Sequence, residues 1–165
     1  MSFTMYVPTK TLFGAGMLNK LHEQRLPGRK ALIVISNGKS TKANGYLARL
    51  ENELKLAGVE WVLFDRVEPN PLRSTVMAGA AAARENGCDF IVALGGGSPM
   101  DASKGIAAMA VNEGDLWDYI HSGSGLGRPL VNRPLPIVAV TTTAGTGSET
   151  DSGGVITNEE MHEKS

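Results

Sequence analysis

Short apolar runs alternate with segments of helical periodicity through the first half of the chain. The runs occupy residues 31–35, 61–64, 90–94, 137–140 and 155–157. A helix is expected between the first two runs, ending at Gly58, and an alanine-rich helix between the Asn70-Pro71 pair and Asn86-Gly87. Because alternating strands and helices need crossover connections, the pattern predicts an α/β fold: a doubly wound, mostly parallel sheet with helices on both faces.

The segment 89–104 combines a buried strand, a glycine turn and a helix start. Three consecutive glycines, 95–97, can take positive φ and let another group approach the backbone. Ser98 is expected at the N-cap, Pro99 at the first helical position, and Asp101 in a Ser-x-x-Asp capping box. Free N–H groups and the positive end of the helix dipole favour a phosphate here, with a plain tight connection as the alternative.

A second glycine- and hydroxyl-rich segment, residues 141–149, directly follows the run 137–140. Its hydroxyl and N–H groups suit a ribose, a pyrophosphate or a carboxamide, although a polar turn that caps its own backbone is an equal alternative. Ligands of doubly wound sheets bind at the carboxyl ends of the strands, where all the suggestive loops fall. The two segments together favour a dinucleotide site.

The second half of the chain is less regular. Residues 117–120 are expected to form a short helix, and 121–129 a mobile surface loop in which His121 is solvated. The run at 153–157 is strand-like, but the polar residues 158–164 show no returning strand, so an unpaired arm is expected. This pattern suggests an N-terminal piece of a longer protein, or one that a partner completes.

Composition narrows the class of protein. The chain has 165 residues and a formal net charge of −1, with no basic block that would indicate nucleic acid or a membrane surface as a partner. Its single cysteine, Cys88, is expected to be a small core residue and excludes an internal disulfide. No secretory signal or membrane-spanning run is visible, so a cytoplasmic protein is expected.

Three motifs together resemble the N-terminal half of the iron-containing (group III) alcohol dehydrogenases: Gly-Gly-Gly-Ser-Pro-Met-Asp at 95–101, Pro-Asn-Pro at 69–71 and Thr-Thr-Ala-Gly-Thr-Gly-Ser-Glu at 142–149. Segments 11–16 and 115–118 also resemble that family. The resemblance implies that residues 1–165 are a Rossmann-like N-terminal domain binding NAD or NADP. An all-helical domain with one divalent metal, Fe²⁺ or Zn²⁺, would follow in a homo-oligomeric enzyme that transfers hydride between the nicotinamide and a small alcohol or aldehyde.

The resemblance also implies roles for individual residues. Gly96, Gly97 and Ser98 would cradle the pyrophosphate, and Asp101 would serve in capping or bind ribose hydroxyls. The adenosine or diphosphate side would be lined by Thr142, Thr143 and Thr146. Asn70 matches a family residue near the cofactor, and Lys164 matches a family lysine that reaches the ribose. Asn70 is equally suited to cap the helix that follows it.

The loop after the first strand bears on cofactor choice. NAD-preferring members place an aspartate at this strand end, but no acidic residue occurs between Ile35 and Leu50. Gly38 and Ser40 offer room and a donor, Lys39 or Lys42 offers charge, and residues 40–45 resemble NADP-using, butanol-dehydrogenase-like members. The expectation is NADP(H) over NAD(H).

The family's metal ligands lie in the helical domain, and the three histidines of this chain, His22, His121 and His162, match none of them. We therefore expect the chain alone to bind the cofactor without catalysing the reaction, with no catalytic or metal residue in it. Two alternatives stay open: a domain of a glycerol dehydrogenase-like or dehydroquinate synthase-like enzyme, and a nucleotide-binding module without catalysis.

Overall fold

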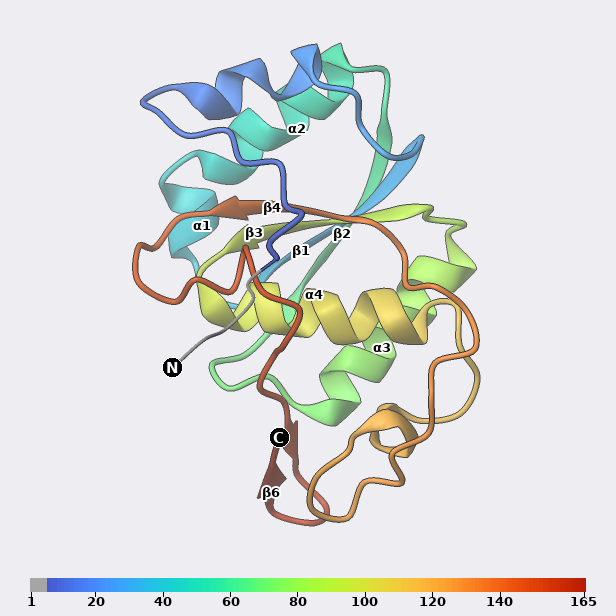
Figure 1. Cartoon of the computed structure of the whole chain (residues 1–165). Coiled ribbons are helices and arrows are strands. Elements are labelled where there is room, and N and C mark those ends of the chain that lie inside the picture. The colour runs from blue at the N-terminus through green and yellow to red at the C-terminus, as the bar shows by residue number, and fades with distance from the viewer. Residues whose placement is uncertain (1–5) are drawn as a thin grey trace.

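The computed structural model describes residues 6–165 and is built around a four-stranded parallel sheet (Figure 1). The sheet order is β2-β1-β3-β4. Its strands are β1 (Lys30–Ser36), β2 (Glu60–Val67), β3 (Phe90–Gly95) and β4 (Ile137–Thr141). The helices are η1 (Met17–Glu23), α1 (Ser40–Ala43), α2 (Tyr46–Leu56), α3 (Arg73–Glu85), α4 (Gly97–Met109) and η2 (Leu116–Tyr119). A short antiparallel hairpin of β5 (Thr157–Asn158) and β6 (Glu163–Lys164) ends the chain.

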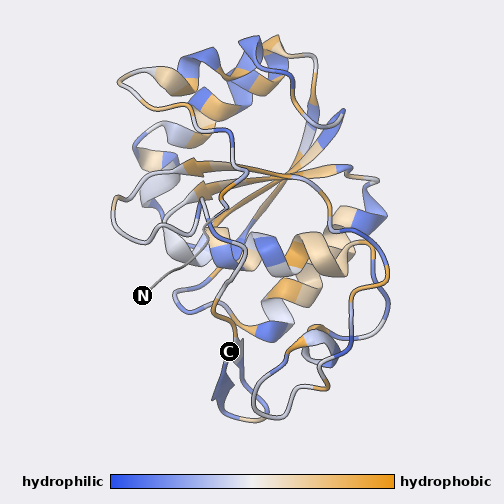
Figure 2. Cartoon of the chain, in the orientation of Figure 1, coloured by the Kyte–Doolittle hydropathy of each residue, from blue (hydrophilic) through white to orange (hydrophobic). Residues whose placement is uncertain are grey.

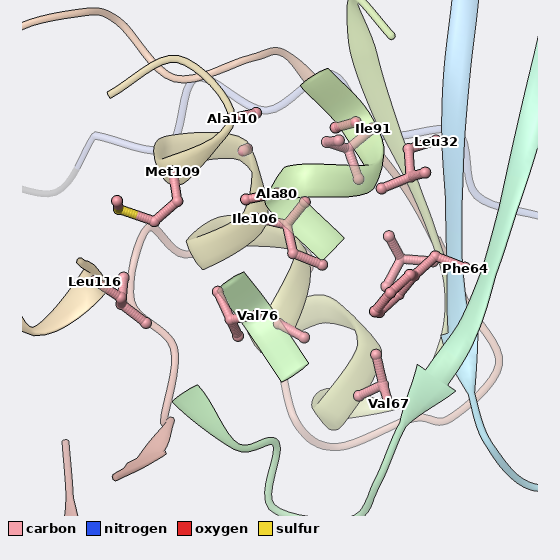
Figure 3. Close-up of a cluster of buried hydrophobic side chains, with 14 of the residues drawn as sticks. Leu32, Phe64, Val67, Val76, Ala80, Ile91, Ile106, Met109, Ala110 and Leu116 are labelled. Atoms are coloured by element: carbon pink, nitrogen blue, oxygen red, sulfur yellow. The ribbon is translucent and has the colours of Figure 1, made fainter. Parts of the chain in front are cut away.

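Helices cover both faces of the sheet, as predicted: α2 and η1 lie on one face, α3 and α4 on the other (Figure 1). Alternate residues of β1 therefore enter two different cores. Leu32 packs in the core with α3 and α4 (Figure 3), and so does Val34. Ile33 and Ile35 pack in the core with α2. The inner strands β1 and β3 are apolar along their length because both of their faces are covered (Figure 2). The predicted α/β doubly wound fold is confirmed.

The order of the strands shows where the winding of the sheet reverses. From β1, the chain moves outward to β2 and then returns past β1 to β3, so the winding direction reverses between β1 and β3. In such sheets, ligands bind at the carboxyl ends of the strands beside that reversal. The loop after β1 and the glycine turn after β3 flank this point.

The start of α4 differs from the prediction. The helix begins at Gly97 with Gly96 at the N-cap, and no side chain caps this start, so the prediction that Ser98 is the N-cap and that Asp101 closes a capping box is wrong. Pro99 is tolerated two residues inside the helix because first-turn N–H groups have no intrahelical acceptor. Its ring packs against Gly95, where an added Cβ would lie 2.9 Å from Pro99 Cγ.

The start of α3 is also shifted. The helix begins at Arg73, not at Pro71, and Asn70 has a left-handed φ of 56°, so it is not the N-cap. Two carboxylates from outside the helix bind its first N–H groups instead: Glu68 accepts from Leu72 N at 2.7 Å and Glu159 from Ser74 N at 3.3 Å. Sequence spacing alone could not reveal the contribution of Glu159, because it is 85 residues away.

The C-terminal residues do not form an unpaired arm, so that prediction is wrong. The strands β5 and β6 pair with each other, and Ile156 and Ser165 exchange two backbone hydrogen bonds of 2.6 and 3.0 Å. Side chains tie this hairpin to the body: the Arg73 guanidinium binds Asp115 and Glu160, each at 2.8 Å, and Glu163 accepts from Ser124 N at 2.9 Å. The returning strand β6 consists of two polar residues, so it has no hydrophobic pattern from which it could be predicted.

Within residues 6–165, the helices are too short or too polar to cross a membrane. The expected short helix at 117–120 is present as η2, and His121 after it is exposed.

Candidate functional site

Three loops meet at the carboxyl edge of the sheet: the loop after β1, the triple-glycine turn after β3, and the threonine-rich loop after β4. The backbone joins the last two, because Thr142 N donates to Gly95 O at 2.9 Å. Parallel pairing of β3 with β4 brings Gly95 opposite Thr141 and so sets the two loops side by side.

The glycine turn and the threonine loop are in direct contact. An added Cβ at Gly96 would lie 3.1 Å from Thr143 Oγ1, and one at Gly97 would lie 3.2 Å from Thr146 Cγ2. Gly95 takes a φ of 148°, which only glycine adopts readily. Larger residues at Gly96 and Gly97 would push the threonine loop away, so the close approach explains why glycines occupy these two positions.

The same turn presents backbone donors. Gly97 and Ser98 occupy the first turn of α4, whose N–H groups have no intrahelical acceptor, and no side chain caps them. The α4 dipole adds positive potential at this end. Amides of this kind suit a phosphate or diphosphate, and the hydroxyls of Thr142, Thr143 and Thr146 are exposed on the adjoining loop.

Asp101 holds the segment that follows the threonine loop. Its Oδ1 accepts from Ser148 Oγ at 2.6 Å and its Oδ2 accepts from Val155 N at 3.1 Å. Both carboxylate oxygens therefore have partners within the protein. Ser148, and Lys104 one helical turn beyond Asp101, are residues that sequence reasoning did not single out. The Asp-x-x-Lys spacing on α4 was the available signal for Lys104.

Asn70 and Lys164 come together although 94 positions separate them. The Lys164 Nζ donates to Asn70 Oδ1 at 2.6 Å, and both residues are exposed. The hairpin thus places Lys164 beside the loop that leads into α3.

The loop after β1 is open. Gly38 and Ser40 are exposed, and the nearest atom to an added Cβ at Gly38 is Ser36 Oγ at 3.8 Å. Lys42 is bound by Asp65 of β2, with Nζ and Oδ2 2.5 Å apart. The hydrogen bond from Lys42 holds the pKa of Asp65 below its ordinary value. Sequence reasoning missed this pairing because Asp65 lies on the neighbouring strand.

None of the three histidines belongs to the three loops at this edge. Residues 6–165 contain no cluster of three His, Cys, Asp or Glu side chains able to hold a metal ion. His22 Nδ1 is 2.6 Å from Glu53 Oε2, joining η1 to α2, while His121 and His162 are exposed. Cys88 is buried, and burial raises the pKa of its thiol, as suits the core residue expected from the sequence.

Comparison with known proteins identifies the family. A family model described as iron-containing alcohol dehydrogenase matches residues 8–165. The chain is 42% identical to a 1,3-propanediol dehydrogenase of Klebsiella pneumoniae, covering 99% of this chain and 42% of that protein. It is 37% identical to NADH-dependent butanol dehydrogenase A of Clostridium acetobutylicum, covering 99% of this chain and 41% of the relative.

Solved structures agree with these matches. The crystal structure of NADH-dependent butanol dehydrogenase A from Thermotoga maritima superposes with a TM-score of 0.89 at 36% identity, covering 99% of this chain and 40% of that one. The chain thus spans about two fifths of the length of the relatives it matches. Because the family model covers nearly all of the sequence and the fold is shared, the chain belongs to the iron-containing alcohol dehydrogenase family.

Proposed function

We propose that this chain is a dinucleotide-binding domain that binds NADP(H) at the carboxyl edge of its sheet. The observation that carries the proposal is the contact between the triple-glycine turn and the threonine loop beside the reversal of strand order. Uncapped helix N–H groups, glycines that allow close approach and exposed hydroxyls there match the chemistry of a diphosphate flanked by sugars.

Each predicted site residue has a role in this proposal. The amides of Gly96, Gly97 and Ser98 would bind the pyrophosphate, and the three threonines would bind the adjoining ribose or diphosphate oxygens. Lys164 and Asn70 would bind a ribose together, since they already form a pair. Asp101 would act chiefly by holding the threonine loop, because both of its oxygens are engaged.

The preference for NADP(H) rests on the loop after β1. No carboxylate side chain follows the end of β1 before α2, and Gly38 leaves space for a 2′-phosphate. Lys39 is the cation available to that phosphate, since Lys42 is bound by Asp65. Both butanol dehydrogenases compared above are named NADH-dependent. Tighter binding of NADH than of NADPH would contradict the proposed preference.

The whole protein is proposed to be a cytoplasmic homo-oligomeric oxidoreductase acting on a small alcohol or aldehyde, in keeping with relatives named for propanediol and butanol. The bound nicotinamide would supply the hydride acceptor or donor. Residues of this chain would bind and orient that cofactor. The described residues do not fit a metal centre, so Fe²⁺ or Zn²⁺ would require ligands outside them.

Titration of the chain with NADPH and NADH, followed by nucleotide fluorescence, tests the proposal. Saturable binding with tighter NADPH affinity is expected, with adenosine alone binding more weakly. Failure of both nucleotides to bind would refute the cofactor site. A second assay with Fe²⁺ or Zn²⁺, NADP⁺ and a small alcohol is expected to show no turnover, and activity of the chain alone would refute a metal site lying outside it.

A further inference from the structure

We infer that Lys104 is a positioning residue for the nucleotide site: it holds residues 148–153 against α4, so that the threonine loop stays over the glycine turn. The inference rests on the proposed function, because the loop it holds is the one proposed to bind the nucleotide. No role in binding was expected for Lys104 from the sequence.

The contacts of Lys104 converge on one segment. Its Nζ donates to Ser148 Oγ at 2.8 Å, to Asp151 Oδ1 at 2.5 Å and to the backbone oxygen of Gly153. The three acceptors span six residues of chain directly after the threonine loop. One side chain of α4 therefore contacts this segment at both of its ends and in its middle.

Asp101 completes the attachment from the previous turn of α4. It accepts from Ser148 Oγ and from Val155 N, so Ser148 is held by both residues of the helix. The backbone of the segment also packs closely on the helix, since an added Cβ at Gly154 would lie 3.1 Å from Asp101 Cα. Residues 148–155 are thus fixed at four successive points.

The geometry argues against direct contact between Lys104 and a phosphate. An ammonium group has three N–H donors, and all three are used by Ser148, Asp151 and Gly153. The Lys104 side chain is 17% exposed and lies 4.0 Å from Asp101 Oδ1 as well. Its charge is therefore matched within the protein, which is the behaviour of a positioning group.

The threonine loop is held at both of its ends. At its first end, Thr142 N is bonded to Gly95 O, and at its second end Ser148 is bonded to Asp101 and Lys104. Thr143 and Thr146 lie over Gly96 and Gly97 between these anchors. Without Lys104 the second anchor weakens, the ordered loop is populated less, and the apparent dissociation constant rises in proportion.

The test compares Lys104→Met with the wild-type full chain by hydrogen exchange and by NADPH titration. We expect faster amide exchange confined to residues 142–155 in the free protein, with an unchanged urea midpoint for the rest of the fold. If the ordered loop falls to a tenth of the population, the dissociation constant for NADPH rises about tenfold. Lys104→Arg, which keeps charge and donors, is expected to restore most of both readouts.

Two further variants keep the test decisive. Lys55→Met makes the same change at an exposed lysine of α2 and is expected to alter neither readout. Asp151→Asn removes the charge of one exposed acceptor and is expected to speed exchange at 148–153 and weaken NADPH binding by a smaller factor, even if Lys104→Met does not fold.

The outcomes separate the two proposals. Weaker NADPH binding by Lys104→Met without faster exchange would overturn the inference and indicate direct contact with the nucleotide. Faster exchange with unchanged affinity would also overturn it. A wild-type chain that binds neither nucleotide would refute the proposed function and a role in binding, while the exchange comparison would still decide whether Lys104 holds the segment.

Discussion

Lys164 donates a 2.6 Å hydrogen bond to the side-chain oxygen of Asn70, across 94 positions of sequence. The bond joins the C-terminal hairpin to the loop before α3, on the side of the sheet where the strands end. The fold thereby brings into contact two residues that are far apart in the sequence.

Loss of this pair is expected to affect binding more than stability. Lys164→Met removes an exposed donor, so the urea midpoint should change little, while NADPH affinity should fall several-fold because a charge-assisted hydrogen bond to the ribose is lost. Fluorescence titration and urea unfolding measure the two effects. In an Asn70→Ala background the same lysine change should cost less, and full additivity would contradict joint action.

Gly97→Val is expected to weaken NADPH binding by about 10–100-fold, the equivalent of losing one hydrogen bond to a charged group. The new side chain would meet Thr146, since even a Cβ would lie 3.2 Å from Thr146 Cγ2. The control is Ala48→Val, at an exposed position of α2 outside the three loops of the proposed site. Unchanged affinity of the valine variant would exclude the diphosphate from this turn.

Asn37→Asp is expected to turn cofactor preference towards NADH. Asn37 is the first residue after β1, where its exposed side chain would meet the adenosine ribose, and its N–H bonds Val67 O at 2.8 Å. A carboxylate there would repel a 2′-phosphate and accept from a 2′-hydroxyl. Asn37→Ser is the neutral control. Equal NADPH affinity in the aspartate variant would place the 2′-position elsewhere.

Acid is expected to weaken the attachment of η1 to α2 through Glu53. Burial acts to raise the pKa of Glu53, but the hydrogen bonds from His22 outweigh it and hold this pKa below its usual 4.5. A carboxyl whose pKa is lower in the folded state contributes stability above its unfolded pKa, and that contribution is lost as pH falls through the folded pKa. Urea unfolding between about pH 3 and about pH 7 measures this loss, since that range brackets the ordinary pKa of a glutamate carboxyl.

Glu53→Gln should therefore be less stable at neutral pH and should lose less stability on acidification. Glu85→Gln, a change at an exposed carboxylate at the end of α3, is the matched control. A Glu53→Gln profile parallel to that of the wild type would show that another group carries the acid sensitivity.

Arg73→Met is expected to loosen the C-terminal hairpin. The guanidinium binds Asp115 and Glu160, and these partners raise the pKa of Arg73 further above its ordinary value. Loss of these bonds should cost about 1–3 kcal/mol and speed proteolysis and amide exchange at residues 157–164. Arg25→Met, at an exposed arginine, should leave both unchanged. A hairpin as protected as in the wild type would show that backbone pairing alone holds it.

Much of the fold could be predicted because hydrophobic periodicity is a local signal. All four strands of the main sheet were located to within three residues, and the ends of α2 and α3 at Gly58 and Asn86-Gly87 agree with the structure. The helix starts were less predictable. Both α3 and α4 lack a capping side chain at the N-cap. At the start of α3, Glu68 accepts from an amide 4 positions away and Glu159 from one 85 positions away.

The candidate site was only partly visible in the sequence. Its glycines and threonines form continuous motifs directly after strands. Because the carboxyl ends of parallel strands lie at the same edge of a sheet, the sequence predicted that these motifs share that edge. The polar partners of three residues could not be predicted from the sequence, because each partner is distant along the chain. Asp65 lies 23 positions from Lys42, Asp151 lies 47 from Lys104, and Val155 lies 54 from Asp101. Which carboxylate a lysine side chain contacts depends on the path that the loops take in the folded chain.

The amino-acid sequence by itself determined where the four strands of the main sheet and the helices α2, α3 and α4 lie, and the family to which the chain belongs. Burial periodicity and glycine-rich motifs are properties of consecutive residues, so both can be read without the fold. Tertiary structure decided the polar attachments: β6 returning along β5, Lys164 meeting Asn70, and α4 holding residues 148–155. Hydrogen bonds need two groups at about 3 Å with the right orientation, and for distant residues only the path of the folded chain supplies that proximity.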